Sequence, residues 1–203
     1  SLFTGPPQAE PSDVELVIDA RVKRLTWRGQ EAKSVEIGLI AAEGGVDIAA
    51  FNIGRFAEAT IAAEGHLRPS PTGPLGAVQV GLEAADLKRL MAVLGLEVPQ
   101  FMGISPSLRD ADILLSVDSE LSEKGRMAVI SISGEIAGAS VEINTTSDAP
   151  LLEFGDGALK LAANIEASEA ARIFGPGGLV PLTGEERAGG AGRVSITGEG
   201  RLS

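Results

Sequence analysis

The stretch at residues 76–99, GAVQVGLEAADLKRLMAVLGLEVP, joins a strand pattern to a helix pattern and decides the fold prediction. In its first half, apolar residues occupy every second position, at Val78, Val80 and Leu82. This period of two is expected of a strand that buries one face. The first half therefore predicts a strand within a sheet that has one apolar side.

The second half of the stretch predicts a short amphipathic helix. Asp86 is suited to the N-cap position, and Gly95 can adopt the left-handed conformation that ends a helix. Pro99 prevents the helix from continuing. The apolar residues between these points recur at helical spacing, at Leu87, Leu90, Met91 and Leu94.

The same strand-then-helix pattern returns at residues 157–181, GALKLAANIEASEAARIFGPGGLVP, which begins 81 residues later. Ser168 is the expected helix cap of this second copy. A recurrence of this kind predicts a repeat protein, in which neighbouring units share one core. We expect a linker at residues 1–12 and one continuous β-repeat domain at 13–203. Its units are 13–110, 111–192 and the start of a third at 193–203.

Further alternating segments predict antiparallel strands, with turns at residues 27–30 and 43–45. A fourth strand is expected to begin at Phe56, and Gly134 is expected to lie in a turn. The fold class is thus mainly β. A meander with one apolar face can remain an open, curled sheet, or it can close into a barrel or sandwich.

Composition excludes several classes of partner. The net charge of −11 argues against nucleic acid and against an anionic membrane surface, because both attract clustered Lys and Arg. Aromatic residues make up only 3% of the chain, so its apolar surfaces consist of aliphatic side chains. The chain has no cysteine, so no disulfide supports the fold.

An open sheet covered only by short helices would leave part of its apolar face exposed, and such a face in a soluble protein usually binds a partner. Aliphatic side chains without convergent polar groups fit lipid acyl chains. The alternative is a structural or adhesive surface module with a closed core and no ligand. The candidate lipid-groove residues are Val14, Leu16, Ile18, Ile37, Leu39, Ile61, Val78, Val80, Leu82, Ile113, Leu115, Val117, Val129, Leu159 and Leu161.

No catalytic or metal-binding residue is predicted, and no cofactor. His66 is the only histidine and lacks a nucleophile motif around it. Paired acids such as Asp110 and Asp112 resemble the carboxylates of glycosidases, but sugar-binding clefts usually add aromatic platforms. We interpret these acids as solvated strand residues, and a hydrolase is the least favoured hypothesis.

The segments DVELVIDARVKRLTWRGQEAKSVEIGL and GGVDIAAFNIGRFAEATIAAEGHL, together with the stretch at residues 76–99, resemble the AsmA family of Gram-negative envelope proteins. The resemblance covers most of residues 13–203. It implies a repeating β-groove, a long curled antiparallel sheet with short helices at the unit ends. It also implies a periplasmic segment of an inner-membrane-anchored parent protein, which reaches the envelope membranes through other parts of that parent. Its implied role is phospholipid transport between the inner and outer membranes, or outer-membrane biogenesis, without catalytic residues.

Overall fold

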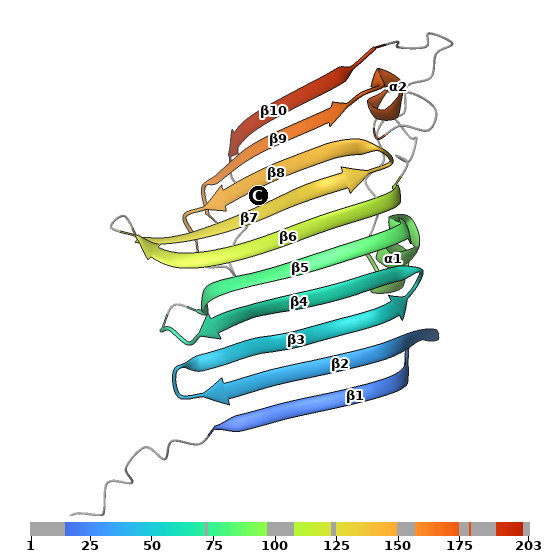
Figure 1. Ribbon diagram of the computed structural model, residues 1–203. Coiled ribbons are helices and arrows are strands. Elements are labelled where there is room, and N and C mark those ends of the chain that lie inside the picture. Colours follow the sequence, from blue (N-terminus) through green and yellow to red (C-terminus); the bar gives the residue numbers. More distant parts are fainter. Residues whose placement is uncertain are drawn as a thin grey trace, which may run out of the picture.

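The computed structural model describes residues 15–71, 73–96, 108–122, 125–149, 157–174, 179 and 190–200. Its strands form one ten-stranded antiparallel sheet in which every strand pairs with its neighbours in the sequence (Figure 1). The mainly β prediction is therefore confirmed. The predicted linker and Val14 lie outside the described residues. In chain order the elements are β1 (Leu16–Trp27), β2 (Gln30–Ala42), β3 (Gly45–Phe56), β4 (Ala59–Arg68), β5 (Leu75–Asp86), α1 (Leu87–Leu94), β6 (Arg109–Ser122), β7 (Gly125–Ile136), β8 (Ala139–Ser147), β9 (Leu159–Ala167), α2 (Ala170–Ile173) and β10 (Gly192–Gly200).

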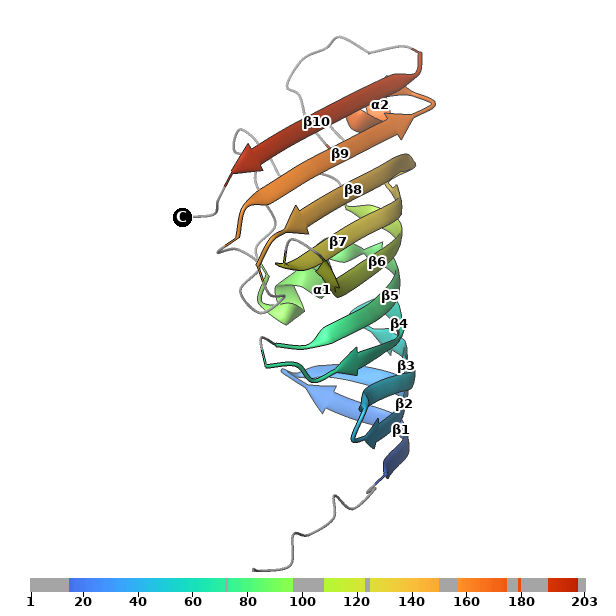
Figure 2. The same cartoon turned by 90° about the vertical axis from the view of Figure 1, so that its left-hand side faces the viewer.

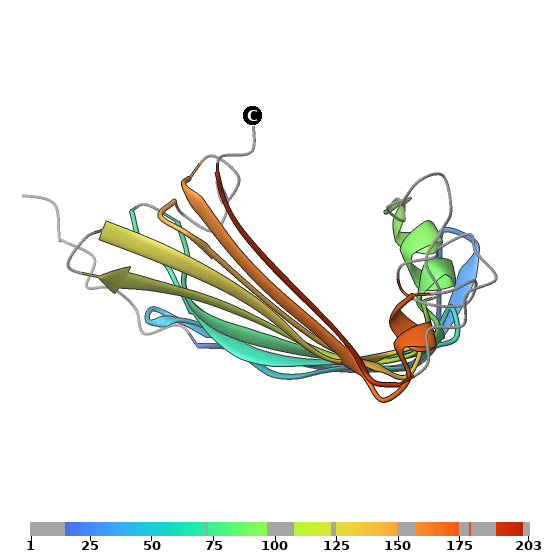
Figure 3. The ribbon, with the colours of Figure 1, turned by 90° about the horizontal axis from the view of Figure 1, so that it is seen from above.

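The sheet is open. β1 and β10 are its two edges and do not pair with each other. The strand direction turns progressively from β1 to β10, as the right-handed twist of strands requires (Figure 2). Seen from above, the strands bend in an open arc, with α1 and α2 on its inner side near the same end of the strands (Figure 3).

Two of the predicted turns are confirmed, and two related predictions are wrong. The chain turns at Arg28 and Gly29 and at Glu43 and Gly44, as the sequence indicated. β4 does not begin at Phe56, which instead ends β3. The turn that follows contains no glycine, yet its residues Ala57 and Glu58 have positive φ angles of 50° and 66°.

Gly134 does not lie in a turn. It lies within β7, and the chain turns after it, between β7 and β8. Its φ is 144°, and a Cβ at this position would lie 2.0 Å from the carbonyl oxygen of Asp112 on β6. Gly134 is therefore needed for the close approach of two neighbouring strands.

The ends of α1 are fixed largely as the sequence predicts. The carboxylate of Asp86 accepts a hydrogen bond from the backbone N–H of Lys88 at 3.0 Å, and Gly95 is left-handed with φ 79°. Arg28, from the β1–β2 turn, adds a hydrogen bond from Nη1 to the carbonyl oxygen of Leu94 at 3.2 Å. These contacts hold α1 at its place against the sheet.

The predicted cap of the second helix is wrong. Glu169, not Ser168, is the N-cap of α2, and no side chain caps it. α2 is a single turn of four residues. Ile173 of this turn is fully buried and packs against Ala139 of β8 and Ala167 of β9.

The two hydrophobic clusters of the described residues each lie between a helix and the sheet. Leu90 of α1 is 3% exposed and belongs to one cluster with Phe56 and three small residues of adjoining strands, Ala59, Ala84 and Ala111. These alanines are direct cross-strand partners on β4, β5 and β6. Small side chains at these positions let α1 approach the sheet closely at this end of the strands.

Candidate apolar binding face

One row of side chains runs across the whole sheet without a polar member. In an antiparallel ladder, residues directly opposite each other project from the same face. The cross-strand register links one residue from each of the ten strands into this row, which we call the central rung. The central rung consists of Ala20, Ile37, Phe51, Ala63, Val80, Leu115, Ile132, Ile143, Ala163 and Ile196.

Three further rungs lie parallel to the central rung on the same face. The rung nearer the helices consists of Val22, Val35, Ile53, Ile61, Leu82, Ile113, Gly134, Val141, Ile165 and Val194. On the other side of the central rung lies a rung of Ile18, Leu39, Ile48, Gly65, Val78, Val117, Ile130, Thr145, Leu161 and Gly198. The last rung consists of Leu16, Ala41, Val46, Leu67, Gly76, Ser119, Ala128, Ser147, Leu159 and Gly200. We call these four rungs together the apolar face, and none of their members carries a charge.

A bulge in β3 preserves the apolar face where simple alternation fails. The pairing of β3 with β4 shifts by one residue between Ile48 and Phe51. Both residues therefore belong to the apolar face although they are three positions apart. A bulge of this kind inserts one residue and re-aims the side chains that follow it.

The structure brings almost all predicted groove residues onto the apolar face. The residues so placed are Leu16, Ile18, Ile37, Leu39, Ile61, Val78, Val80, Leu82, Ile113, Leu115, Val117, Leu159 and Leu161. Val129 is not among them: its cross-strand partners are Asp118 and Thr146, so it projects from the opposite face. Its assignment to the groove is wrong.

The predicted groove residues leave out seven members of the central rung. Alternation places Ala20 and Ala163 on the correct face, but neither is predicted as a groove residue. The other five are Phe51, Ala63, Ile132, Ile143 and Ile196. For Ile132 and Ile143 the signal was available, because each alternates with polar neighbours in its strand. Phe51 carried no such signal, since the bulge that aims it inward has no mark in the sequence.

The helices cover only the margin of the apolar face. The residues packed against the α1 cluster include Ile53, Ile61, Leu82 and Ile113 of the rung nearer the helices, and Ile37 of the central rung. Most side chains of the central rung are half-buried, and Ile196 on the edge strand β10 is 50% exposed. The rung farthest from the helices differs, because Ser119, Ala128 and Ser147 of β6, β7 and β8 are buried there. A broad aliphatic surface thus faces the inner side of the arc.

The opposite face carries charged and polar side chains, with apolar residues such as Val17, Leu114 and Val129 between them. It carries cross-strand ion pairs such as Arg21 with Glu36 at 2.9 Å and Lys160 with Glu199 at 3.3 Å. Ser131 donates a hydrogen bond to Asn144 Oδ1 at 2.8 Å on the same side. Charges are therefore sorted away from the apolar face, which is the pattern of a sheet with one face for water and one for apolar contact.

Carboxylates also line a surface depression near the ends of β4, β5 and β6, where Glu58, Glu83, Asp110 and Asp112 lie together with Thr60. Within the described part of the chain, no group of His, Cys, Asp and Glu side chains has the arrangement of a metal site. In the same residues, no helix is both long enough and apolar enough to cross a membrane.

No family model, curated protein or solved structure matches this chain.

Proposed function

We propose that the protein holds lipid acyl chains against its apolar face and acts without catalysis. The observation that carries this proposal is the central rung, ten apolar side chains in register across ten strands with no polar interruption. The two described helices lie near one end of the strands, and apolar surface left exposed to water is costly. An acyl chain lying on it would remove apolar area from water on both sides of the contact.

The energetics favour acyl chains over ligands that need polar recognition. Each fully buried methylene contributes about 0.8 kcal/mol, so a chain of many methylenes binds through burial alone. The side chains of the rungs are mostly aliphatic and none is charged. Phe51 is the aromatic member, and Ser119, Thr145 and Ser147 are the hydroxyl-bearing ones. Binding would therefore depend on the length of the acyl chain and little on its headgroup.

The β-groove, the phospholipid ligand and the periplasmic location that the family resemblance implies are part of the same proposal. We propose that the arc forms part of a repeating β-groove, as in the AsmA family, and that the ligand is phospholipid moving between inner and outer membranes in the periplasm. The resemblance of the sequence to that family supports the location, and the polar outer face and aliphatic inner face support the ligand class.

Lipid extraction and native mass spectrometry of protein purified from a Gram-negative host test the proposal. We expect bound phospholipid in the native protein and its loss in Val80→Asp, which places a charge in the central rung. Gln79→Asp is the matched control, because Gln79 is the preceding residue and projects from the polar face. If native protein carries no lipid, or if both variants retain it equally while folded, the proposal is wrong and a structural module is favoured.

A further inference from the structure

The edge strand β1 is unusually suited to pair with another strand. It is twelve residues long, contains neither Pro nor Gly, and shows no bulge against β2. Apolar side chains are exposed on both of its faces: Leu16 is 54% exposed on the apolar face and Val17 is 61% exposed on the opposite face. A long, regular edge strand with exposed apolar residues is a site of strand addition.

The other edge strand lacks these properties. β10 is nine residues long and contains three glycines, Gly192, Gly198 and Gly200. Ile196 is its one large hydrophobic side chain that is exposed. Glycine weakens a strand because it adds flexibility and no packing surface. The two edges are therefore unequal, which favours pairing of β1 with another β1 over pairing of β1 with β10.

We propose that β1 is an association edge at which a second copy of this chain adds antiparallel, with Ala20 opposite Ala20 of the other copy. In this register Asp19 of each copy lies opposite Arg21 of the other, so two cross-strand ion pairs form about a two-fold axis. Ile18 lies opposite Val22, and the apolar faces of both sheets continue into each other.

The charges of β1 select this register. The two nearest registers that keep the apolar faces matched are centred on Asp19 and on Arg21 instead of Ala20. The first places Asp19 opposite Asp19 of the other copy, and the second places Arg21 opposite Arg21. Like charges directly opposite each other destabilise a strand pair. The register centred on Ala20 avoids both contacts.

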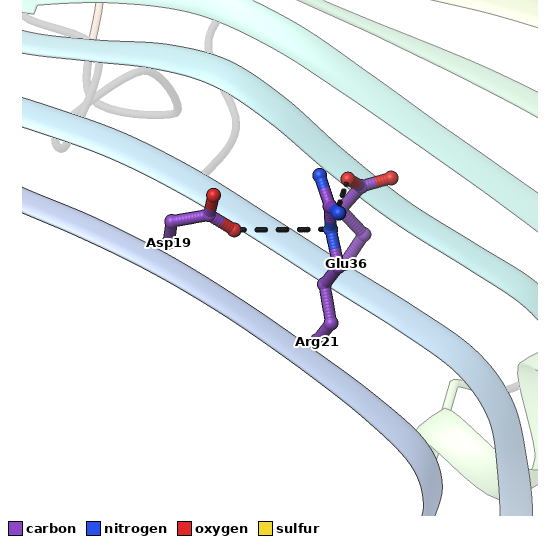
Figure 4. A network of polar contacts seen from close by, with 3 residues as sticks. All are labelled: Asp19, Arg21 and Glu36. Atoms are coloured by element: carbon purple, nitrogen blue, oxygen red, sulfur yellow. Dashed lines mark hydrogen bonds and ion pairs between the residues drawn. The ribbon is translucent and has the colours of Figure 1, made fainter.

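Both charged groups are accessible in the single chain. The side chains of Asp19 and Arg21 are 69% and 74% exposed, and they approach each other only to 3.9 Å within the strand (Figure 4). Arg21 Nε also donates to Glu36 Oε1 at 2.9 Å on β2. Because a guanidinium has five N–H donors, Arg21 can keep Glu36 and still receive a carboxylate from a second copy.

Single-cysteine variants test the register, because the native chain has no cysteine. In oxidising buffer we expect Ala20→Cys to form a disulfide-linked homodimer, since opposite Cβ atoms of paired strands are within disulfide reach. Val22→Cys is the matched control on the same strand and face, and in this register its two copies lie about four residues apart along the strands. Equal cross-linking of both variants, no cross-linking of Ala20→Cys, or a disulfide between Ala20→Cys and Ile196→Cys chains would each overturn the proposal.

A mixing experiment tests the ion pairs. Asp19→Arg chains present two positive residues to each other, and Arg21→Asp chains present two negative ones. By sedimentation equilibrium we expect each variant alone to dimerise about tenfold more weakly than native protein, and the mixture to regain native affinity as a heterodimer. Circular dichroism confirms that each variant is folded. Variants that dimerise as well alone as in mixture would overturn the assigned contacts.

Discussion

Ligand affinity should rise steadily with acyl-chain length if the apolar face binds acyl chains. A fully enclosed chain would gain about 0.8 kcal/mol per methylene, but this sheet is open, so a chain lying on it is covered on about one side. We therefore expect about half that gain, roughly 0.4 kcal/mol per methylene. Two added methylenes should strengthen binding about fourfold, and no more than about fifteenfold.

The dimensions of the apolar face indicate that this rise should continue through the lengths found in membranes. Ten strands with a spacing of about 4.8 Å extend over about 43 Å, and four rungs spaced by two residues extend over about 20 Å. A bilayer core of about 30 Å holds two acyl chains end to end, so one chain occupies about 15 Å. Neither direction of the face limits a chain of this length.

Isothermal titration calorimetry with saturated monoacyl lipids of one headgroup, below their micelle concentrations, measures the dependence. A second series that varies the headgroup at fixed chain length is the control. Affinities that are independent of chain length, or that follow headgroup charge, would refute the reasoning.

Two stability predictions follow from the packing of the sheet. Leu90→Ala should lower the free energy of unfolding by about 2–5 kcal/mol in urea titrations, because Leu90 of α1 is buried against the sheet at 3% exposure. Leu94→Ala, at a 39% exposed position of the same helix, should lower it by less than about 1 kcal/mol. Equal losses would show that α1 is not seated as described. Gly134→Ala should destabilise by about 2–3 kcal/mol, because its Cβ would lie 2.0 Å from a carbonyl oxygen of β6. Gly44→Ala, whose Cβ would meet nothing within 4 Å, should change stability by less than about 0.5 kcal/mol, and a neutral Gly134→Ala would contradict the close strand approach.

Strand content and the boundaries of α1 could be predicted because each depends on local chemistry. Alternation reports which side chains face the core, and Asp86 and Gly95 satisfy the backbone groups at the two ends of the helix. The assignment of Val129 failed because it lies in an apolar run, Met127 to Ile130, where alternation is ambiguous. Ser131 shares its face and could have corrected the prediction.

The remaining errors concern backbone conformations without a sequence mark. The turn at Ala57 and Glu58 adopts positive φ without glycine, so the start of β4 was misplaced. The sequence predicts a turn at Gly134, but this glycine lies within β7 and allows the backbone of the neighbouring strand to approach closely. Tertiary contacts decide both cases, and a single sequence does not report them.

The central claim, that acyl chains lie on the apolar face, is tested most directly by photo-cross-linking at neighbouring positions of β6. Leu115 belongs to the central rung, while Leu114, 43% exposed, projects from the opposite face. A benzophenone amino acid at each position, irradiated in a Gram-negative host, reports by mass spectrometry which side chain contacts lipid. We predict lipid adducts at position 115 and few at position 114. Equal adducts at both positions, or adducts only at 114, would contradict the claim.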